Sequence, residues 1–131
     1  MKYTLSVLVE NQPGVLSKVV SLFARRGYNI DSLAVGTTED PTMSRMTIVG
    51  QGDDRILEQV EKQLNKVIPV IKVRSLGQDA ATAELLLVKV ACDPQTLGKV
   101  NEIAALMQAK VVDVSKATVT LQYAGEHDKC E

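Results

Sequence analysis

The segment from Asn11 to Leu16, Asn-Gln-Pro-Gly-Val-Leu, has the residue types and spacing of a strand-to-helix turn that could hold a small anion. Pro13 suits the first helical position, and Gly14 has no Cβ to keep a ligand away from the backbone. The N–H groups of a first helical turn and the positive end of the helix dipole favour a carboxylate. The alternative is a tight turn that only caps a helix, because Pro and Gly are common in turns.

Asn29 and Ile30 form the second candidate segment. In the predicted topology Asn29 begins an edge strand, and an edge strand can pair with a second copy of itself, which would bring Asn29 of one subunit near the Gly14 turn of its neighbour. An asparagine amide accepts from an ammonium and donates to a carboxylate, so the two segments together favour an α-amino acid. Its side chain needs an apolar wall, which could come from Val15, Leu16, Ile30 and Leu33. Taken alone, Asn29 could equally be a turn residue.

The sequence offers little for catalysis. The sole histidine, His127, lies in a polar C-terminal segment where nothing would orient it. Cys92 and Cys130 lack zinc-ligand spacing and a partner residue for nucleophilic catalysis, and they indicate a reduced, cytoplasmic protein. Glycine-rich nucleotide motifs and the GxSxG motif are missing from the sequence. We therefore expect a non-catalytic protein with no cofactor or metal of its own.

The composition is that of a soluble globular protein, with 45% apolar and 24% charged residues. A formal net charge of −1 and only four aromatic residues, one Phe and three Tyr, disfavour a nucleic-acid partner. The sequence also lacks an apolar run of about 18 residues and the apolar core of a signal peptide. Membrane insertion and secretion are therefore not expected.

The elements that position the candidate segments follow from the hydrophobic periodicity of the first half. Alternation predicts strands over 3–10, 28–37, 43–50 and 67–74, and helical spacing predicts helices over 14–26 and from 53 to about 64. We expect a bulge or a bend between Ile30 and Leu33, and a sheet-edge position for the strand that contains Pro69. The first helix is predicted to bury Leu16, Val19, Val20 and Phe23. The order βαββαβ, with two helices on one face of an antiparallel sheet, is the ferredoxin-like arrangement of the α+β class.

The second half repeats this order incompletely. We predict a linker over 76–83, a buried strand over 84–91, a helix that begins at Asp93-Pro94, and strands over 111–114 and 119–123. The helix is predicted to bury Leu97, Val100, Ile103, Ala104 and Met107. The expected domains are 1–75 and 84–131, the second being an incomplete βαββ unit that is marginal or completed by another chain. A disordered tail is predicted over 125–131.

Three segments, 5–17, 26–33 and 40–47, together resemble the small regulatory subunit of acetolactate synthase, also called acetohydroxyacid synthase. The first alone would indicate only an ACT domain, a widespread amino-acid-sensing module. The similarity continues through 57–64 and more weakly through 86–90. Members of this family usually run on through one further helix and strand, so the resemblance implies that the second domain is truncated here.

The resemblance implies a non-catalytic homodimer, paired through its ACT domains, that activates a large catalytic subunit in branched-chain amino acid biosynthesis. Thiamine diphosphate, Mg and FAD are expected in that large subunit. The small subunit would confer feedback inhibition by valine, or by leucine or isoleucine. The effector would lie between two ACT domains, at positions that match Asn11, Gly14, Val15, Leu16, Asn29 and Ile30.

Two other functions compete with this one. The chain could be a freestanding ACT-type module that regulates a different enzyme or a transcription factor. RNA recognition by the sheet is disfavoured, because the strand over 45–51 lacks the aromatic residues that stack bases.

The solvated face of the second helix is expected to carry Glu58, Glu61 and Lys62. The alternative for these charged residues is a role in subunit docking.

Overall fold

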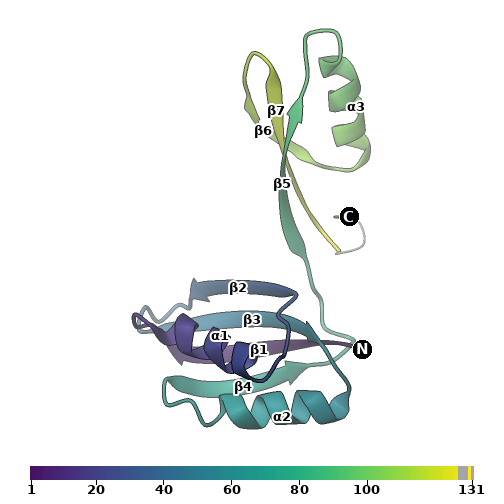
Figure 1. Cartoon of the computed structure of the whole chain (residues 1–131). Coiled ribbons are helices and arrows are strands. Elements are labelled where there is room, and N and C mark those ends of the chain that lie inside the picture. Colours follow the sequence, from purple (N-terminus) through teal and green to yellow (C-terminus); the bar gives the residue numbers. More distant parts are fainter. Residues whose placement is uncertain (127–129, 131) are drawn as a thin grey trace. The chain divides into compact units, whose positions relative to one another are not determined.

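The computed structural model describes residues 1–126 and Cys130, and the chain divides into two compact units, residues 1–80 and 81–131 (Figure 1). Among these described residues, no helix is long and apolar enough to cross a membrane. His127 and most of the predicted tail lie outside the described residues. Gly125, which we assigned to that tail, instead ends a strand.

The N-terminal unit is a four-stranded antiparallel sheet with two helices on one face (Figure 1). Along the chain its elements are β1 (Lys2–Glu10), α1 (Val15–Arg25), β2 (Ser32–Thr37), β3 (Met43–Gln51), α2 (Asp54–Leu64) and β4 (Val70–Leu76). The strand order is β2-β3-β1-β4, so β2 and β4 are the two edges. This confirms the predicted βαββαβ order and ferredoxin-like arrangement.

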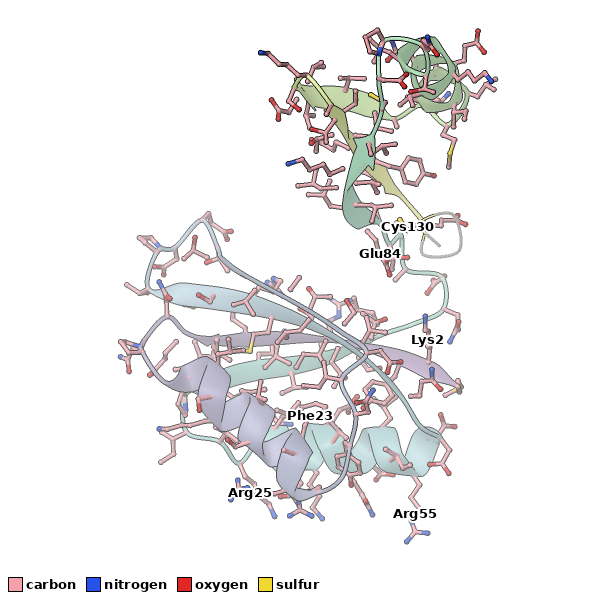
Figure 2. All side chains as sticks on the ribbon, turned by 45° about the horizontal axis from the view of Figure 1, so that its top comes forward. Lys2, Phe23, Arg25, Arg55, Glu84 and Cys130 are labelled. Carbon is pink, nitrogen blue, oxygen red and sulfur yellow. The ribbon has the colours of Figure 1, made fainter. Side chains whose placement is uncertain are left out.

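The core of this unit lies between the helices and one face of the sheet. Alternate residues of β1 point into it and are at most 4% exposed: Tyr3, Leu5, Val7 and Val9. Phe23 of α1 points toward the same core and meets Tyr28 edge to face at 6.5 Å between ring centroids (Figure 2). From α2, Val60 and Leu64 complete the packing.

The buried face of α1 differs from the predicted one. Val19 and Phe23 are buried as expected, but Leu16 and Val20 are 43% and 38% exposed, and Val15 and Leu22 are buried in their place. Both sets have helical spacing and share two members. The periodicity therefore located the apolar half of the helix but not which flank of it meets the sheet.

Two strand boundaries also differ from the prediction. β2 begins at Ser32 rather than at residue 28, and it pairs with β3 in continuous register without a bulge. A bend at Asp31 lies between Ile30 and Leu33, which is the other form of irregularity that we predicted there. β4 begins after Pro69, not around it. The Pro69 carbonyl accepts the Glu10 N–H at 2.9 Å. Proline has no backbone N–H to donate to the sheet, so regular pairing begins after it.

In its described part, the C-terminal unit has a three-stranded antiparallel sheet and the helix α3. Its elements are β5 (Glu84–Ala91), α3 (Leu97–Leu106), β6 (Lys110–Val114) and β7 (Thr118–Gly125), with strand order β5-β7-β6. The βαββ order is as predicted. Residues 77–83 between β4 and β5 form no helix or strand.

The predicted core of the C-terminal unit is mostly exposed. Leu85 and Leu87 of β5 are 67% and 61% exposed, and Ile103 of α3 is 56% exposed. Within the described part of this unit, Ala104 and Val119 are the buried apolar residues. The described elements, α3 and three strands, enclose too little volume to bury the rest.

The start of α3 is set by Asp93, although the helix itself begins three residues beyond Pro94. Asp93 Oδ1 accepts the N–H groups of Gln95 and Thr96, each at 2.9 Å, and the Thr96 hydroxyl at 3.1 Å. The bonds from the Thr96 N–H and hydroxyl hold the pKa of the Asp93 carboxyl below its ordinary value. The turn before α3 therefore stabilises the ionised form of the Asp93 carboxyl.

Asp93 should therefore make stability depend on pH. Asp93→Asn keeps an oxygen that accepts the same N–H groups but cannot ionise. Because the folded-state pKa is lowered, the stability of the wild type relative to this variant should be fully present above about pH 4 and lost as the pH falls through the folded-state pKa. Urea unfolding of both proteins across that range measures the difference, and a difference that stays constant with pH would contradict the assignment.

Candidate functional site

Gly14 is the N-cap of α1 and adopts the left-handed conformation, with φ 86° and ψ −9°. The Val15 N–H reaches the Gln12 carbonyl only at 3.4 Å. Within the described part of the chain, the N–H groups of Leu16 and Ser17 have no acceptor. The first turn of α1 thus presents free donors beside a residue that has no side chain, which is the arrangement that suits a carboxylate.

Asn11 links this turn by hydrogen bonds to the connection between β2 and β3. Its Nδ2 donates to the Pro41 carbonyl at 2.9 Å, and its backbone N–H donates to the Thr42 carbonyl at 2.8 Å. The Oδ1 atom has no donor among the residues that the structure describes. Asn11 is therefore held in place through its amide nitrogen while its acceptor oxygen stays available for an ammonium group.

The β2–β3 connection that holds Asn11 is itself braced by Asp40. The Asp40 carboxylate accepts the Thr42 N–H at 2.9 Å and the Thr42 hydroxyl at 2.7 Å, and these bonds lower the pKa of Asp40. Sequence reasoning missed the role of this connection in positioning Asn11. The signal was the Asp-Pro-Thr sequence, in which an aspartate bonds the backbone two residues on.

Asn29 lies in the loop between α1 and β2, three residues before the strand that we expected it to begin. Its Nδ2 donates to Asp31 Oδ1 at 2.8 Å, and the side chain is exposed. Backbone pairing with β3 starts at Asp31, whose N–H donates to the Val49 carbonyl at 2.8 Å. The amide of Asn29 is therefore fixed close to the first paired residue of the edge strand.

The apolar residues predicted around the site differ in exposure. Val15 is only 4% exposed and belongs to the core. Leu16 is 43% exposed, Leu33 is 37% exposed, and Ile30 is half-buried. Leu16, Ile30 and Leu33 therefore remain as the apolar surface near the two candidate segments.

Within one chain the two candidate segments do not meet. They lie at opposite ends of α1, which has 11 residues and so measures about 16 Å. β1 and β2 end on the same side of the sheet, because both pair antiparallel with β3. The Gly14 turn follows β1 and lies beside the last residue of β2, Thr37, whereas Asn29 precedes the first residue, Ser32.

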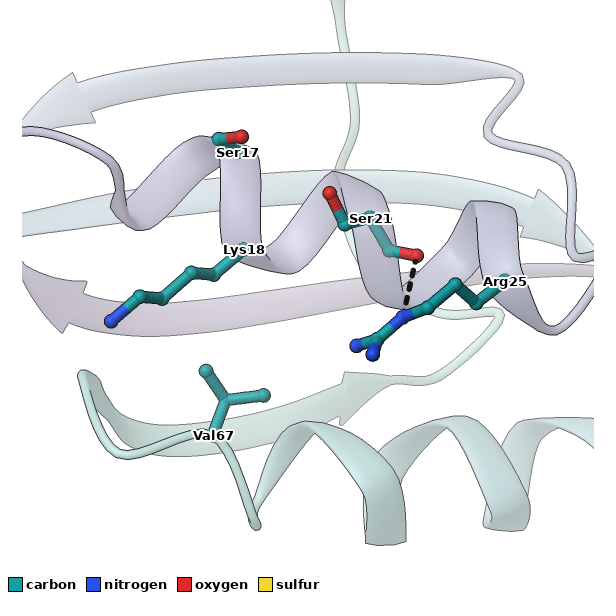
Figure 3. A pocket seen from close by; sticks show the side chains of 5 residues that line it. All are labelled: Ser17, Lys18, Ser21, Arg25 and Val67. Carbon is teal, nitrogen blue, oxygen red and sulfur yellow. Dashed lines mark hydrogen bonds between the residues drawn. The ribbon is translucent and has the colours of Figure 1, made fainter.

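A cleft of about 400 Å³ lies between α1 and Val67, and none of the predicted site residues lines it (Figure 3). Its walls are formed by Ser17, Lys18, Ser21, Arg25 and Val67. Arg25 Nε donates to the Ser21 carbonyl at 3.4 Å, so the guanidinium folds back along its own helix. Residues 1–126 and 130 also contain no cluster of His, Cys, Asp or Glu that could hold a metal ion.

Two family models cover most of the chain. The model described as "AHAS small subunit-like ACT domain" matches residues 5–72, and the model described as "Small subunit of acetolactate synthase" matches residues 83–131. The two matches correspond closely to the two structural units.

Curated relatives and a solved structure agree with these matches. The sequence is 53% identical to the acetolactate synthase small subunit of Mycolicibacterium smegmatis, over 98% of this chain and 76% of the relative. It is 44% identical to the acetolactate synthase isozyme 3 small subunit of Escherichia coli, over 100% of this chain and 81% of the relative. The crystal structure of the acetolactate synthase small subunit from Thermotoga maritima superposes with a TM-score of 0.89 at 36% identity, over 98% of this chain and 81% of that one.

Because Gly14 has a left-handed backbone conformation, a larger residue there should destabilise the fold through backbone strain rather than through a steric clash. A Cβ at Gly14 would have no described heavy atom within 4 Å, and the same is true at Gly36, where φ is not positive. Gly14→Ala should therefore lower the free energy of unfolding by about 1 kcal/mol, and Gly36→Ala should change it by less than about 0.5 kcal/mol. Urea unfolding of the two variants tests this, and equal effects would contradict it.

Proposed function

The chain belongs to the acetolactate synthase small subunit family, and from this premise we propose that it is the non-catalytic regulatory subunit of that enzyme, controlled by a branched-chain amino acid. It activates a cytoplasmic large subunit, which carries thiamine diphosphate, Mg and FAD. Valine, or leucine or isoleucine, binds the small subunit and causes feedback inhibition. The single observation that carries this proposal is the free edge of β2, which has the Gly14 turn beside one end and Asn29 beside the other.

The β2 edge supports a symmetric dimer. All six residues of β2 are exposed in the single chain, and the outer backbone groups of an edge strand are unpaired. Leu33 and Val35 of β2 are 37% and 46% exposed, and the exposed large apolar residues of α1 are Leu16 and Val20. Pairing of β2 with a second copy of itself would satisfy the backbone groups and bury this apolar strip.

That pairing also assembles the amino-acid site. In an antiparallel two-fold pair, the first residue of one β2 lies beside the last residue of the other. The Gly14 turn lies beside the last residue of β2, and Asn29 precedes the first. The two segments, from different subunits, therefore meet at each end of the β2–β2 interface, which we call the seam. A two-fold dimer would therefore contain two equivalent sites, each incomplete in a single chain.

Each chemical group of an α-amino acid has a counterpart at this seam. The carboxylate would accept the free N–H groups of Leu16 and Ser17, aided by the helix dipole. The ammonium would donate to Asn11 Oδ1 and to the partner's Asn29. An aliphatic side chain would contact Leu16 and the partner's Ile30, which supports a branched-chain ligand.

Regulation follows from the position of the ligand. A ligand held between two subunits shifts their arrangement only by the difference in its affinity for the two states. A coupling free energy of about 1 to 3 kcal/mol changes the response of the large subunit by about 5- to 150-fold. The assembled seam is thus a sufficient place for feedback control.

The dimer requires an apolar strip on β2. Val35→Lys should shift the chain from dimer to monomer in sedimentation equilibrium, because it buries a charge at the seam. Ile68→Lys is the matched control, since Ile68 is 93% exposed in the turn before β4 and lies away from the β2 edge. A Val35→Lys protein that remains fully dimeric at micromolar concentration would overturn the proposed interface.

The ligand site is tested by a negative charge at the helix tip. Gly14→Asp should weaken valine binding by at least about tenfold in calorimetry, because it sets a carboxylate where the carboxylate of the ligand would lie. Gly14→Ala introduces the same backbone cost and a Cβ without the charge, so it should weaken binding less than Gly14→Asp, and the difference between the two variants measures the effect of the charge. Unchanged valine affinity of the dimeric Gly14→Asp variant would refute this site.

A further inference from the structure

The face of the N-terminal sheet opposite the two helices carries three cations in one cluster. Arg45 of β3 and Lys72 and Arg74 of β4 line a cavity of about 100 Å³, together with Ser6 and Leu8 of β1. We call these three basic residues the open-face cations. They come from strands on both sides of β1, so the cluster spans the centre of the sheet.

The strand register explains why these three side chains gather there. Leu8 pairs with Arg45 on one side and with Lys72 on the other, and Ser6 pairs with Arg74. These positions alternate with Val7 and Met46, which face the core, so the cations all point to the opposite face. Sheet spacings separate the Cα atoms by about 10 Å across the strands and about 7 Å along β4.

One of the open-face cations is held in a fixed orientation. Arg45 Nη1 donates to Ser6 Oγ, and Ser6 is only 7% exposed. The Ser6 hydroxyl accepts this bond, so its own proton remains available to donate. The cavity is therefore lined by guanidinium, ammonium and hydroxyl donors.

The residues that the structure describes supply no counter-charge to the open-face cations. Among residues 1–126 and 130, no carboxylate forms an ion pair with any of the open-face cations. On this face of β1, the acidic residue is Glu10 at the end of the strand, and it pairs with Met43. Three unneutralised like charges on neighbouring sheet positions oppose one another and would be stabilised by an anionic partner.

We propose that the open-face cations are the docking surface for an acidic segment of the catalytic large subunit. The spacing of about 7 Å along β4 matches alternate residues of an extended strand, and an acidic helix spaces its carboxylates by about 5 to 6 Å. Such a segment presents several carboxylates to all three cations, and arginine binds carboxylates with paired hydrogen bonds. This inference rests on the proposed function, because it needs a catalytic partner.

A protein segment fits this face better than a nucleic acid does. The six central positions of β1 and β3 on this face carry no aromatic ring on which bases could stack; they are Thr4, Ser6, Leu8, Arg45, Thr47 and Val49. Tyr3 belongs to the core on the other face. The half-buried Leu8 at the centre of the cations suits the apolar part of a peptide segment.

The test compares two triple variants that remove the same charge from different surfaces. One is Arg45→Gln, Lys72→Gln and Arg74→Gln. The control is Arg55→Gln, Lys62→Gln and Lys66→Gln, on or just after α2, where all three side chains are exposed and Arg55 points away from the sheet (Figure 2). Association of each full chain with the purified large subunit is measured by biolayer interferometry at about 50 and about 200 mM KCl.

We expect the open-face triple to bind the large subunit at least about tenfold more weakly and to lose most of the salt dependence. The α2 triple should bind within about threefold of the wild type. Both variants should still dimerise and bind valine, which separates failure of this inference from failure of the proposed function.

Three results would overturn the inference. They are an unchanged affinity of the open-face triple, an equal loss in both triples, and retention of RNA in a filter assay that only the open-face triple loses. A wild-type chain that binds no large subunit would overturn the proposed function as well.

Discussion

The packing of α1 on the apolar face of β1 is the interaction on which the rest of the N-terminal unit depends. Leu5 and Val7 are fully buried at the centre of the sheet, and Val19 of α1 is buried with them. Once α1 is fixed over the sheet, its two ends and the loops that follow them are fixed too. The Gly14 turn and Asn29 therefore occupy opposite ends of the β2 edge as a direct consequence of core packing.

That edge leaves hydrogen bonds unmade, which is the physical basis of the proposed dimer. β3 pairs with β2 on one side and with β1 on the other, but β2 has no neighbour on its outer side. Exposed apolar side chains on β2 and α1 add a hydrophobic gain to the backbone gain. The same pairing that completes the sheet would bring the carboxylate donors of one subunit to the amide of the other.

The two proposed binding surfaces share a single strand. β1 carries Ser6 and Leu8 at the open-face cations, and it leads through Asn11 into the turn at Gly14. The effector and the large subunit would then both contact β1 or the turn that follows it. Binding at one surface can affect the other only if the ligand has different affinities for two conformational states of the protein. The C-terminal unit contrasts with this arrangement, because many apolar residues of its β5, α3 and β6 are exposed.

The sequence by itself determined the order of helices and strands, the two edge strands and the glycine turn. These depend on local periodicity and on the conformational preferences of Pro, Gly and Asp, which neighbouring residues express without tertiary contacts. The resemblance of three sequence segments also indicates the family.

Only the tertiary structure decided which flank of α1 is buried, where β2 begins, and that the Val15 side chain is buried in the core. Helical spacing allowed either flank, and the choice depends on how the helix lies on the sheet. The open-face cations are also a tertiary feature, since Arg45 is separated by 27 positions from Lys72 and the residues meet only through the register of β1 with both neighbours. Contacts between distant segments depend on strand pairing and packing, which a local pattern does not encode.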